Sequence, residues 1–214
     1  MRTPAALKVV VPIGAAASVA ALCRSIVRQR RNPQPFPAAR ARALDNPLAR
    51  RQAAAVVRGL DLAPRMRVLD VGAGVGRLSI PLAAAVAPEG DVVALDVQQE
   101  MLDMLQKRAG AADVHNIRTI CAAAGAGSLG PGRFDRAVLA AVLGEIPHDR
   151  RVAALREIRE ALEPDGILWV IETVGDPHYQ SHTAVARLGK EAGFNVRGTR
   201  RLGMTRLTEL VVGA

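Results

Sequence analysis

Three glycines and one aspartate in this chain have the types and spacing of a nucleoside-binding crevice. Gly72, Gly74 and Gly76 directly follow a short hydrophobic run, and glycine lets the backbone approach a ligand without an intervening Cβ. Asp96 ends the next hydrophobic run, about one βαβ unit later. A carboxylate at that position can accept hydrogen bonds from both hydroxyl groups of a ribose. The spacing therefore predicts a site for a cofactor with an adenosine-like ribose.

The charges around the glycines indicate which kind of cofactor fits. Nicotinamide enzymes carry G-x-G-x-x-G, whereas this chain has G-x-G-x-G with Arg77 where the last glycine would stand. Asp70, two residues before Gly72, adds a negative group where a pyrophosphate would be repelled. The pattern favours a ligand with a cationic portion.

Four segments in this order resemble class I S-adenosylmethionine-dependent methyltransferases. They are residues 68–76, 93–96, 134–139 and 162–168, the last reading Leu-Glu-Pro-Asp-Gly-Ile-Leu. The resemblance covers roughly residues 45–214 and is nearest to the quinone C-methyltransferase-like group of small-molecule enzymes. It implies methyl transfer with S-adenosylmethionine as the cofactor.

The resemblance also assigns cofactor-binding roles to particular residues. Asp70 would support the loop and the amino-acid end of the cofactor, Asp96 would hold the ribose and Val97 would touch the adenine. The loop itself would be formed by Gly72, Ala73, Gly74 and Gly76. Related enzymes often have an acid after the third strand, but here the chain reads Cys121-Ala122-Ala123-Ala124. A backbone group of Ala122 would then make the adenine contact.

Candidate catalytic residues lie in the loop after the fourth predicted strand. Glu145 and His148 are each able to accept a proton or orient an acceptor, although a solvated loop acid and a helix-capping histidine are the alternatives. A base is needed only if the acceptor must lose a proton. Glu172 ends the fifth predicted strand, and more polar side chains follow just beyond it, namely His178, Tyr179 and His182. Their irregular spacing predicts no metal site.

From residue 65 onward, strands and helices alternate, which predicts an α/β fold. We expect a Rossmann-like, seven-stranded, mostly parallel sheet in a three-layer α/β/α arrangement with an antiparallel C-terminal hairpin. The expected strands span residues 65–71, 92–96, 116–121, 134–141, 166–172, 194–200 and 206–212. The expected helices span residues 77–87, 98–110, 150–162 and 181–192, preceded by a helical stretch at 40–60 with a break near Asn46-Pro47.

The chain divides into three parts by composition. Residues 1–31 form a hydrophobic and basic segment, residues 32–64 a proline-rich linker with leading helices, and residues 65–214 the methyltransferase domain. The formal net charge is +9. Residues 1–51 hold ten Lys or Arg and one acid, whereas residues 52–214 hold nineteen of each sign. Because a nucleic-acid enzyme would spread positive charge around its site, we expect no nucleic-acid partner.

The N-terminal segment has several interpretations. Residues 9–23 are uncharged and apolar, but this core is shorter than the roughly 20 residues that span a bilayer. We expect an N-terminal hydrophobic helix that anchors the chain, either spanning the membrane or lying at its interface. The arginines that follow it would place the catalytic domain in the cytoplasm. A cleaved transit peptide, which would place the domain in an organelle matrix, a secretory signal and a soluble packing helix are the alternatives.

Two functions from different classes remain. The first is a methyltransferase acting on a small, lipophilic acceptor, which the membrane segment and the electrically neutral domain favour. The second is a non-catalytic module that keeps the fold for binding or assembly, which the missing adenine acid and the lack of an obvious base favour. The sequence names neither the acceptor molecule nor its methylated atom, because one fold hosts many acceptors.

Overall fold

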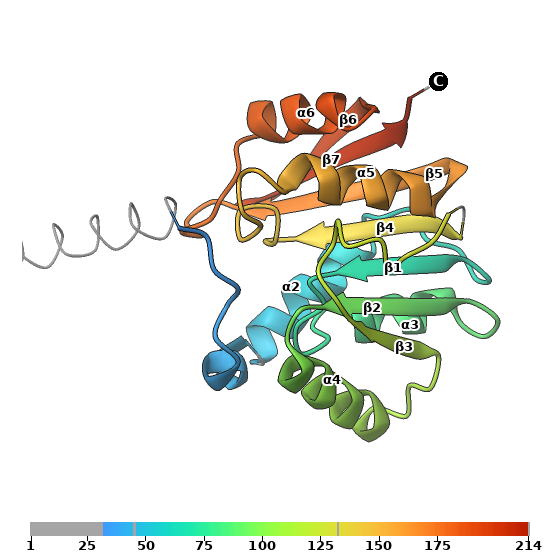
Figure 1. The fold of residues 1–214 in the computed structure, drawn as a ribbon. Helices are drawn as coiled ribbons and strands as arrows, with labels where there is room; N and C mark the ends of the chain where they lie inside the picture. Colours follow the sequence, from blue (N-terminus) through green and yellow to red (C-terminus); the bar gives the residue numbers. More distant parts are fainter. Residues whose placement is uncertain (1–31, 45, 132, 214) are drawn as a thin grey trace, which may run out of the picture.

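The computed structural model describes residues 32–44, 46–131 and 133–213, and its centre is one seven-stranded sheet in the order β3-β2-β1-β4-β5-β7-β6 (Figure 1). Six strands run parallel, and β7 runs antiparallel to β5 and β6. The strands are β1 (Arg67–Val71), β2 (Asp91–Asp96), β3 (Ile117–Cys121), β4 (Phe134–Ala140), β5 (Leu162–Thr173), β6 (Phe194–Leu202) and β7 (Thr205–Val212). The predicted Rossmann-like sheet is confirmed.

Helices cover both faces of this sheet. The helical elements are the 3-10 helix η1 (Ala38–Leu44) and the α-helices α2 (Pro47–Val57), α3 (Ser79–Val86), α4 (Gln99–Ala111), α5 (Arg151–Ala161) and α6 (His182–Glu191). Helices α2 and α3 pack on one face, and α4 lies beside α3. Helices α5 and α6 pack on the other face. The three-layer α/β/α arrangement is therefore as predicted.

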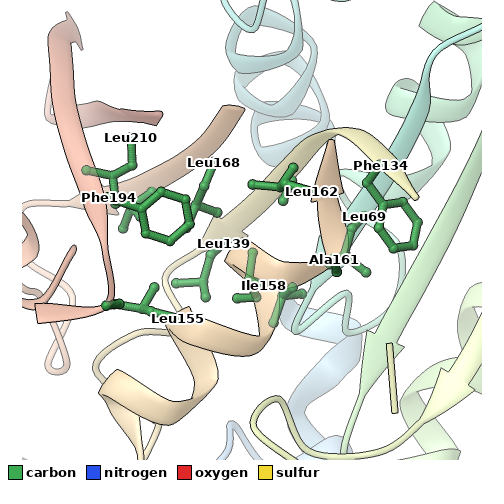
Figure 2. Close-up of a cluster of buried hydrophobic side chains, with 14 of the residues drawn as sticks. Leu69, Phe134, Leu139, Leu155, Ile158, Ala161, Leu162, Leu168, Phe194 and Leu210 are labelled. Atoms are coloured by element: carbon green, nitrogen blue, oxygen red, sulfur yellow. The ribbon is translucent and has the colours of Figure 1, made fainter. Parts of the chain in front are cut away.

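Successive residues of each strand point to opposite faces, which explains the uninterrupted hydrophobic runs. In β1, Leu69 packs with α5 and α6, whereas Val68 packs with α2 and α3. Figure 2 shows the first of these layers, in which Leu155 and Ile158 of α5 lie against Leu139 of β4. Strands buried on both faces need apolar residues at every position.

Local signals set the starts of two helices. The side chain of Asn46 accepts a hydrogen bond from the Ala49 amide at 2.9 Å, and Pro47 occupies the first helical position of α2. Ser181 caps α6 in the same way through the Ala184 amide. The predicted break near Asn46-Pro47 is confirmed, because a proline is favoured at the first turn of a helix and disfavoured inside one.

The predicted antiparallel C-terminal hairpin is formed by β6 and β7, and the start of one strand differs from the prediction. Strand β7 lies between β5 and β6, so the antiparallel strand is inside the sheet and the parallel strand β6 forms the edge. Strand β5 starts at Leu162, immediately after α5, and not at residue 166. The Pro-Asp-Gly stretch within residues 162–168 is thus an irregularity inside β5, where its register against β4 shifts.

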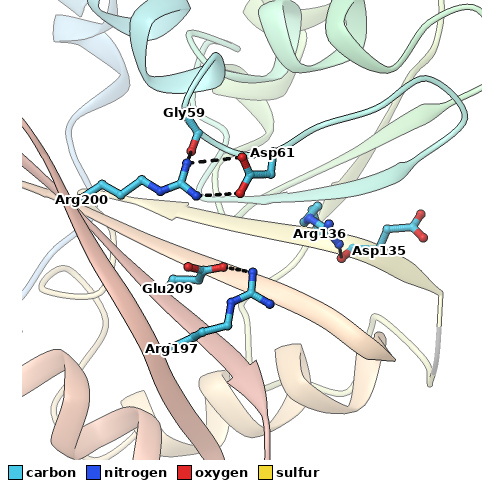
Figure 3. Close-up of polar contacts among 7 residues, drawn as sticks. All are labelled: Gly59, Asp61, Asp135, Arg136, Arg197, Arg200 and Glu209. Atoms are coloured by element: carbon cyan, nitrogen blue, oxygen red, sulfur yellow. Dashed lines mark hydrogen bonds and ion pairs between the residues drawn. The ribbon is translucent and has the colours of Figure 1, made fainter.

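An ion pair between Arg200 and Asp61 joins the β6–β7 hairpin to the segment that follows α2 (Figure 3). Arg200 of β6 donates to the carboxylate of Asp61 at 2.7 Å and to the Gly59 carbonyl at 2.8 Å. The hydrogen bond from Arg200 lowers the pKa of Asp61. The Arg200 guanidinium also lies 5.0 Å from the ring centroid of Trp169. These contacts join the edge strand to the connection between α2 and β1.

The predicted N-terminal hydrophobic helix falls within residues 1–31, outside the described residues. Across the described ranges, no helix combines the length and the apolar composition that a membrane crossing requires.

Candidate active site

A cavity of about 470 Å³ opens at the carboxyl ends of β1, β2 and β4. In parallel α/β sheets, ligands bind at this edge, where the strand order reverses. Its lining comes from the loops after these strands, from β3–β4 and β5–α6 connections, and from residues 33–36 ahead of η1. The cavity therefore brings together loops that lie far apart in the sequence.

The three glycines that follow β1 are needed for two different structural reasons. A Cβ on Gly72 would lie 2.2 Å from the side chain of Val142, and one on Gly76 would lie 2.7 Å from Leu105. Both positions have positive φ. Gly74 also has a positive φ, but nothing lies within 4 Å of its Cβ position, and it lines the cavity. Gly72 and Gly76 thus allow close packing, whereas Gly74 exposes backbone to a ligand.

Asp96 lies at the end of β2 and lines the cavity, with only 8% of its surface exposed. One carboxylate oxygen accepts the Gly74 amide at 2.8 Å, and the other accepts the Gln98 amide at 2.9 Å. Because each carboxylate oxygen has two lone pairs, both can accept a further hydrogen bond. This geometry fits two adjacent ribose hydroxyls above Gly74.

Asp70 lies beneath the glycine loop and is not among the cavity-lining residues. Its carboxylate accepts a 2.6 Å hydrogen bond from the hydroxyl of Ser79, the first residue of α3. Burial raises the pKa of Asp70 to about 6, the Ser79 hydrogen bond opposes that rise, and the nearby Asp96 adds to it. Asp70 therefore ties the loop to α3, while a contact with the amino-acid end of the cofactor stays a prediction.

The predicted adenine contacts lie together on the far side of Asp96. Val97 lines the cavity and is 47% exposed. Ala122 lines the cavity as well, but its amide donates to the Asp96 carbonyl at 3.0 Å. That amide is therefore already used, and the neighbouring Ala123, also in the lining, offers the next backbone group.

A short segment ahead of η1 crosses the cavity, which the sequence did not predict. The Phe36 amide donates to Glu145 Oε2 at 3.2 Å, and the Phe36 carbonyl accepts from Gln98 Nε2 at 2.9 Å. Ala41 of η1 is buried against Val75 of the glycine loop. We call residues 33–36 the strap. The prolines of this segment predicted only a linker, and nothing in the sequence predicted its hydrogen bonds to Gln98 and Glu145.

Glu145 is the candidate catalytic residue that the structure brings to the cavity. Burial raises its pKa to about 7, the Phe36 amide opposes the rise, and the charges of Asp176 and Asp96 add to it. Asp176 also lines the cavity, although the sequence analysis did not single it out. His148 is exposed and is not among the lining residues.

Behind the cavity lies a buried carboxyl group next to a buried guanidinium. Glu172, at the end of β5, is 3% exposed; burial raises its pKa to about 8, while the Gln180 hydrogen bond and the Arg151 charge oppose that rise. Within the described part of the chain, its Oε1 atom has no hydrogen-bond partner. Arg151 donates to the carbonyls of Gly144 and Ile146, both at 3.0 Å, and so holds the loop that carries Glu145.

The remaining polar candidates, His178, Tyr179 and His182, do not line the cavity. His182 Nδ1 lies 3.3 Å from the hydroxyl of Thr208 and 3.2 Å from that of Thr199, against β6 and β7. The His178 amide donates to the side chain of Asp176 at 2.7 Å. Among the described residues, no group of histidine, cysteine and acidic side chains is arranged to hold a metal ion.

Comparison with known proteins agrees with this geometry. Residues 68–166 match the family model described as "Methyltransferase domain". By sequence, this part of the chain is similar to a methyltransferase domain. It includes β1 with its glycine loop, β2 with Asp96, and the Glu145 loop.

The curated relatives share about half of their length with this chain. Demethylmenaquinone methyltransferase from Listeria welshimeri is 34% identical over 106 residues, which cover 50% of this chain and 44% of the relative. The Geobacillus stearothermophilus protein of the same name is 30% identical over 118 residues, covering 55% and 50%. The chain therefore spans only part of these relatives.

Solved structures share the fold of the domain. A SAM-dependent methyltransferase from Aquifex aeolicus superimposes with a TM-score of 0.75 at 22% identity, covering 82% of this chain and 98% of that one. Magnesium protoporphyrin IX methyltransferase from Synechocystis PCC 6803, solved with bound SAM, gives a TM-score of 0.65 at 22% identity, with 89% and 97% covered.

Proposed function

We propose that this protein transfers a methyl group from S-adenosylmethionine to a small, lipophilic acceptor of the quinone class. The observation that carries the proposal is the Asp96 carboxylate, which faces the cavity directly beside the backbone of Gly74. The cavity has a carboxylate that can accept hydrogen bonds from ribose hydroxyls, an exposed glycine backbone and further acidic lining residues. These features suit a nucleoside that carries a positive charge. The names of the curated relatives favour a quinone as the acceptor.

S-adenosylmethionine supplies an electrophilic methyl group on a positively charged sulfur, so transfer is a direct displacement. The work of the protein is then mainly to align the donor with the acceptor. Asp96 and the glycine loop would fix the nucleoside. The strap, held at Phe36 by Gln98 and Glu145, would cover the reacting atoms and exclude water.

Glu145 would hold the proton that the acceptor loses. A reduced quinone becomes a stronger carbon nucleophile when a ring hydroxyl group gives up its proton to a base. A base works best when its pKa is near the working pH, and the pKa of Glu145 is raised to about 7. This assignment favours a catalytic protein over the non-catalytic module, for which no base would be needed.

The test is methyl transfer by the purified full chain. Labelled S-adenosylmethionine is mixed with a reduced demethylated naphthoquinone carrying an isoprenoid tail, and in parallel with catechol and a nucleobase. We expect label in the extracted quinone, with loss of transfer in Asp96→Ala. Label only in catechol or the nucleobase would reject the acceptor class, and no transfer at all would favour the non-catalytic module.

We also propose that residues 1–31 attach the protein to a membrane, with the methyltransferase domain on the cytoplasmic side. The support is the apolar run at residues 9–23 and the arginines that follow it. Fractionation of cells that express the chain with and without residues 1–31 tests this. We expect only the longer form in the membrane fraction. Equal distribution of both forms would reject the anchor, and a shortened mature protein would favour a cleaved transit peptide.

A further inference from the structure

The cavity contains charges of both signs, and one of its cations has no assigned role. Its acidic lining residues are Asp96, Glu145 and Asp176, and its cationic lining residues are Arg77 and Arg150. S-adenosylmethionine carries a positive sulfonium, a positive ammonium and a negative carboxylate. The acids suit the first two charges, and an arginine is the lining side chain that can pair with the carboxylate through its charge.

Arg77 lies on the cofactor side of the cavity. It follows Gly76 directly and stands two residues before the start of α3. It is partly buried, and no described residue forms a hydrogen bond or ion pair with its side chain. Its positive charge lowers the pKa of Asp70 beneath the loop. A partly buried guanidinium that lines a cavity, with no hydrogen bond or ion pair to a described residue, is suited to bind an anionic group there.

Arg150 has a different environment. It is exposed, and its backbone amide donates to the Pro147 carbonyl at 2.9 Å in the loop that carries Glu145. This places Arg150 on the acceptor side, whereas Arg77 belongs to the loop that contacts Asp96 through Gly74. An arginine fork also matches a carboxylate through two parallel hydrogen bonds.

We propose that Arg77 binds the carboxylate at the amino-acid end of the cofactor, an inference that rests on the proposed function. The arginine at the position where nicotinamide enzymes have their last glycine then has a function of its own. In nicotinamide enzymes that last glycine allows close packing of helix and strand, whereas here the position holds a cation that recognises an amino acid. The ligand class is a nucleoside joined through sulfur to an α-amino acid.

Calorimetry on the full chain with two ligands tests this assignment. S-adenosylhomocysteine has the amino-acid end, and 5′-methylthioadenosine has the same nucleoside and sulfur without it. We expect Arg77→Ala to weaken binding of S-adenosylhomocysteine by about tenfold or more, because hydrogen bonds to charged groups are worth about 1.5–3 kcal/mol. Binding of 5′-methylthioadenosine should be unchanged, which also shows that the variant is folded.

Two matched variants sharpen the result. Arg77→Lys keeps the charge but loses the fork, so we expect an intermediate loss for S-adenosylhomocysteine. Arg150→Ala should leave both affinities unchanged. Equal losses for both ligands in Arg77→Ala, no loss, or a selective loss in Arg150→Ala would overturn the assignment. Failure of the unaltered chain to bind either ligand would overturn the proposed function with it.

Discussion

The two halves of the cavity are built in different ways. The half formed by the ends of β1 and β2 consists of backbone, with Gly74 open to the cavity and Asp96 held by two amides. The half formed by the ends of β4 and β5 relies on side chains. Burial raises the pKa of Glu145, which lines it, to about 7 and that of Glu172, which lies behind it, to about 8. The first half suits a ligand of fixed shape, and the second suits proton transfer.

This difference separates binding from chemistry within one cavity. Changes on the cofactor side should alter ligand affinity or folding, whereas changes on the acceptor side should alter turnover and its pH dependence. The strap connects the two halves, because Phe36 contacts Gln98 on one side and Glu145 on the other.

The largest expected effect is on turnover. Glu145→Gln keeps an oxygen for the Phe36 amide but cannot take a proton, so we expect kcat to fall by about 10²–10⁴-fold while the affinity for S-adenosylhomocysteine stays unchanged. In the unaltered protein, the rate should rise with pH through about 7, because burial raises the pKa of Glu145 to that value and only the ionised form is a base.

His148→Ala is the matched control, since His148 is exposed and outside the lining. Its turnover should equal that of the unaltered protein. The comparison fails if Glu145→Gln retains full turnover, or if it loses cofactor affinity and turnover to the same extent.

A smaller effect is expected from the glycine loop, and there it should appear in stability. Gly72→Ala places a Cβ 2.2 Å from Val142 at a positive φ, so we expect a loss of about 1–3 kcal/mol in the free energy of unfolding. Gly74→Ala meets no neighbouring atom and should lose less stability but more cofactor affinity. Denaturant unfolding and calorimetry on both variants measure the two quantities, and identical profiles would contradict the separate roles.

The smallest effect concerns Glu172. Its carboxyl pKa is raised from 4.5 to about 8, so the folded state binds its proton more tightly than the unfolded state does. The protonated Glu172 therefore makes its full contribution to the free energy of unfolding below pH 4.5, and this contribution is lost as the pH rises toward 8. Glu172→Gln removes that loss, and we expect a stability gain on the order of 1 kcal/mol at pH 8.5, seen as a higher Tm. If the Tm of Glu172→Gln at pH 8.5 is equal to or lower than that of the unaltered protein at the same pH, the prediction is wrong.

The cofactor half and the sheet could be predicted from the sequence because their signals are local. Glycines at fixed spacing and an acid at a strand end are contiguous in the chain, and burial on both faces forces apolar strands. The acceptor half could not be predicted to the same extent. Asp176 and the strap reach the cavity only through tertiary packing, Glu145 owes its raised pKa to burial, and the position of β7 depends on pairing between distant segments.

Calorimetric titration of the full chain with S-adenosylmethionine tests the central claim most directly. We predict binding to the unaltered protein, weakened by about 10–100-fold in Asp96→Asn, because a charged acceptor for the ribose hydroxyls is lost. Asp103→Asn, which changes an exposed acid on α4, should bind as tightly as the unaltered protein. Absence of binding to the unaltered protein, or equal affinity in Asp96→Asn, would contradict the account.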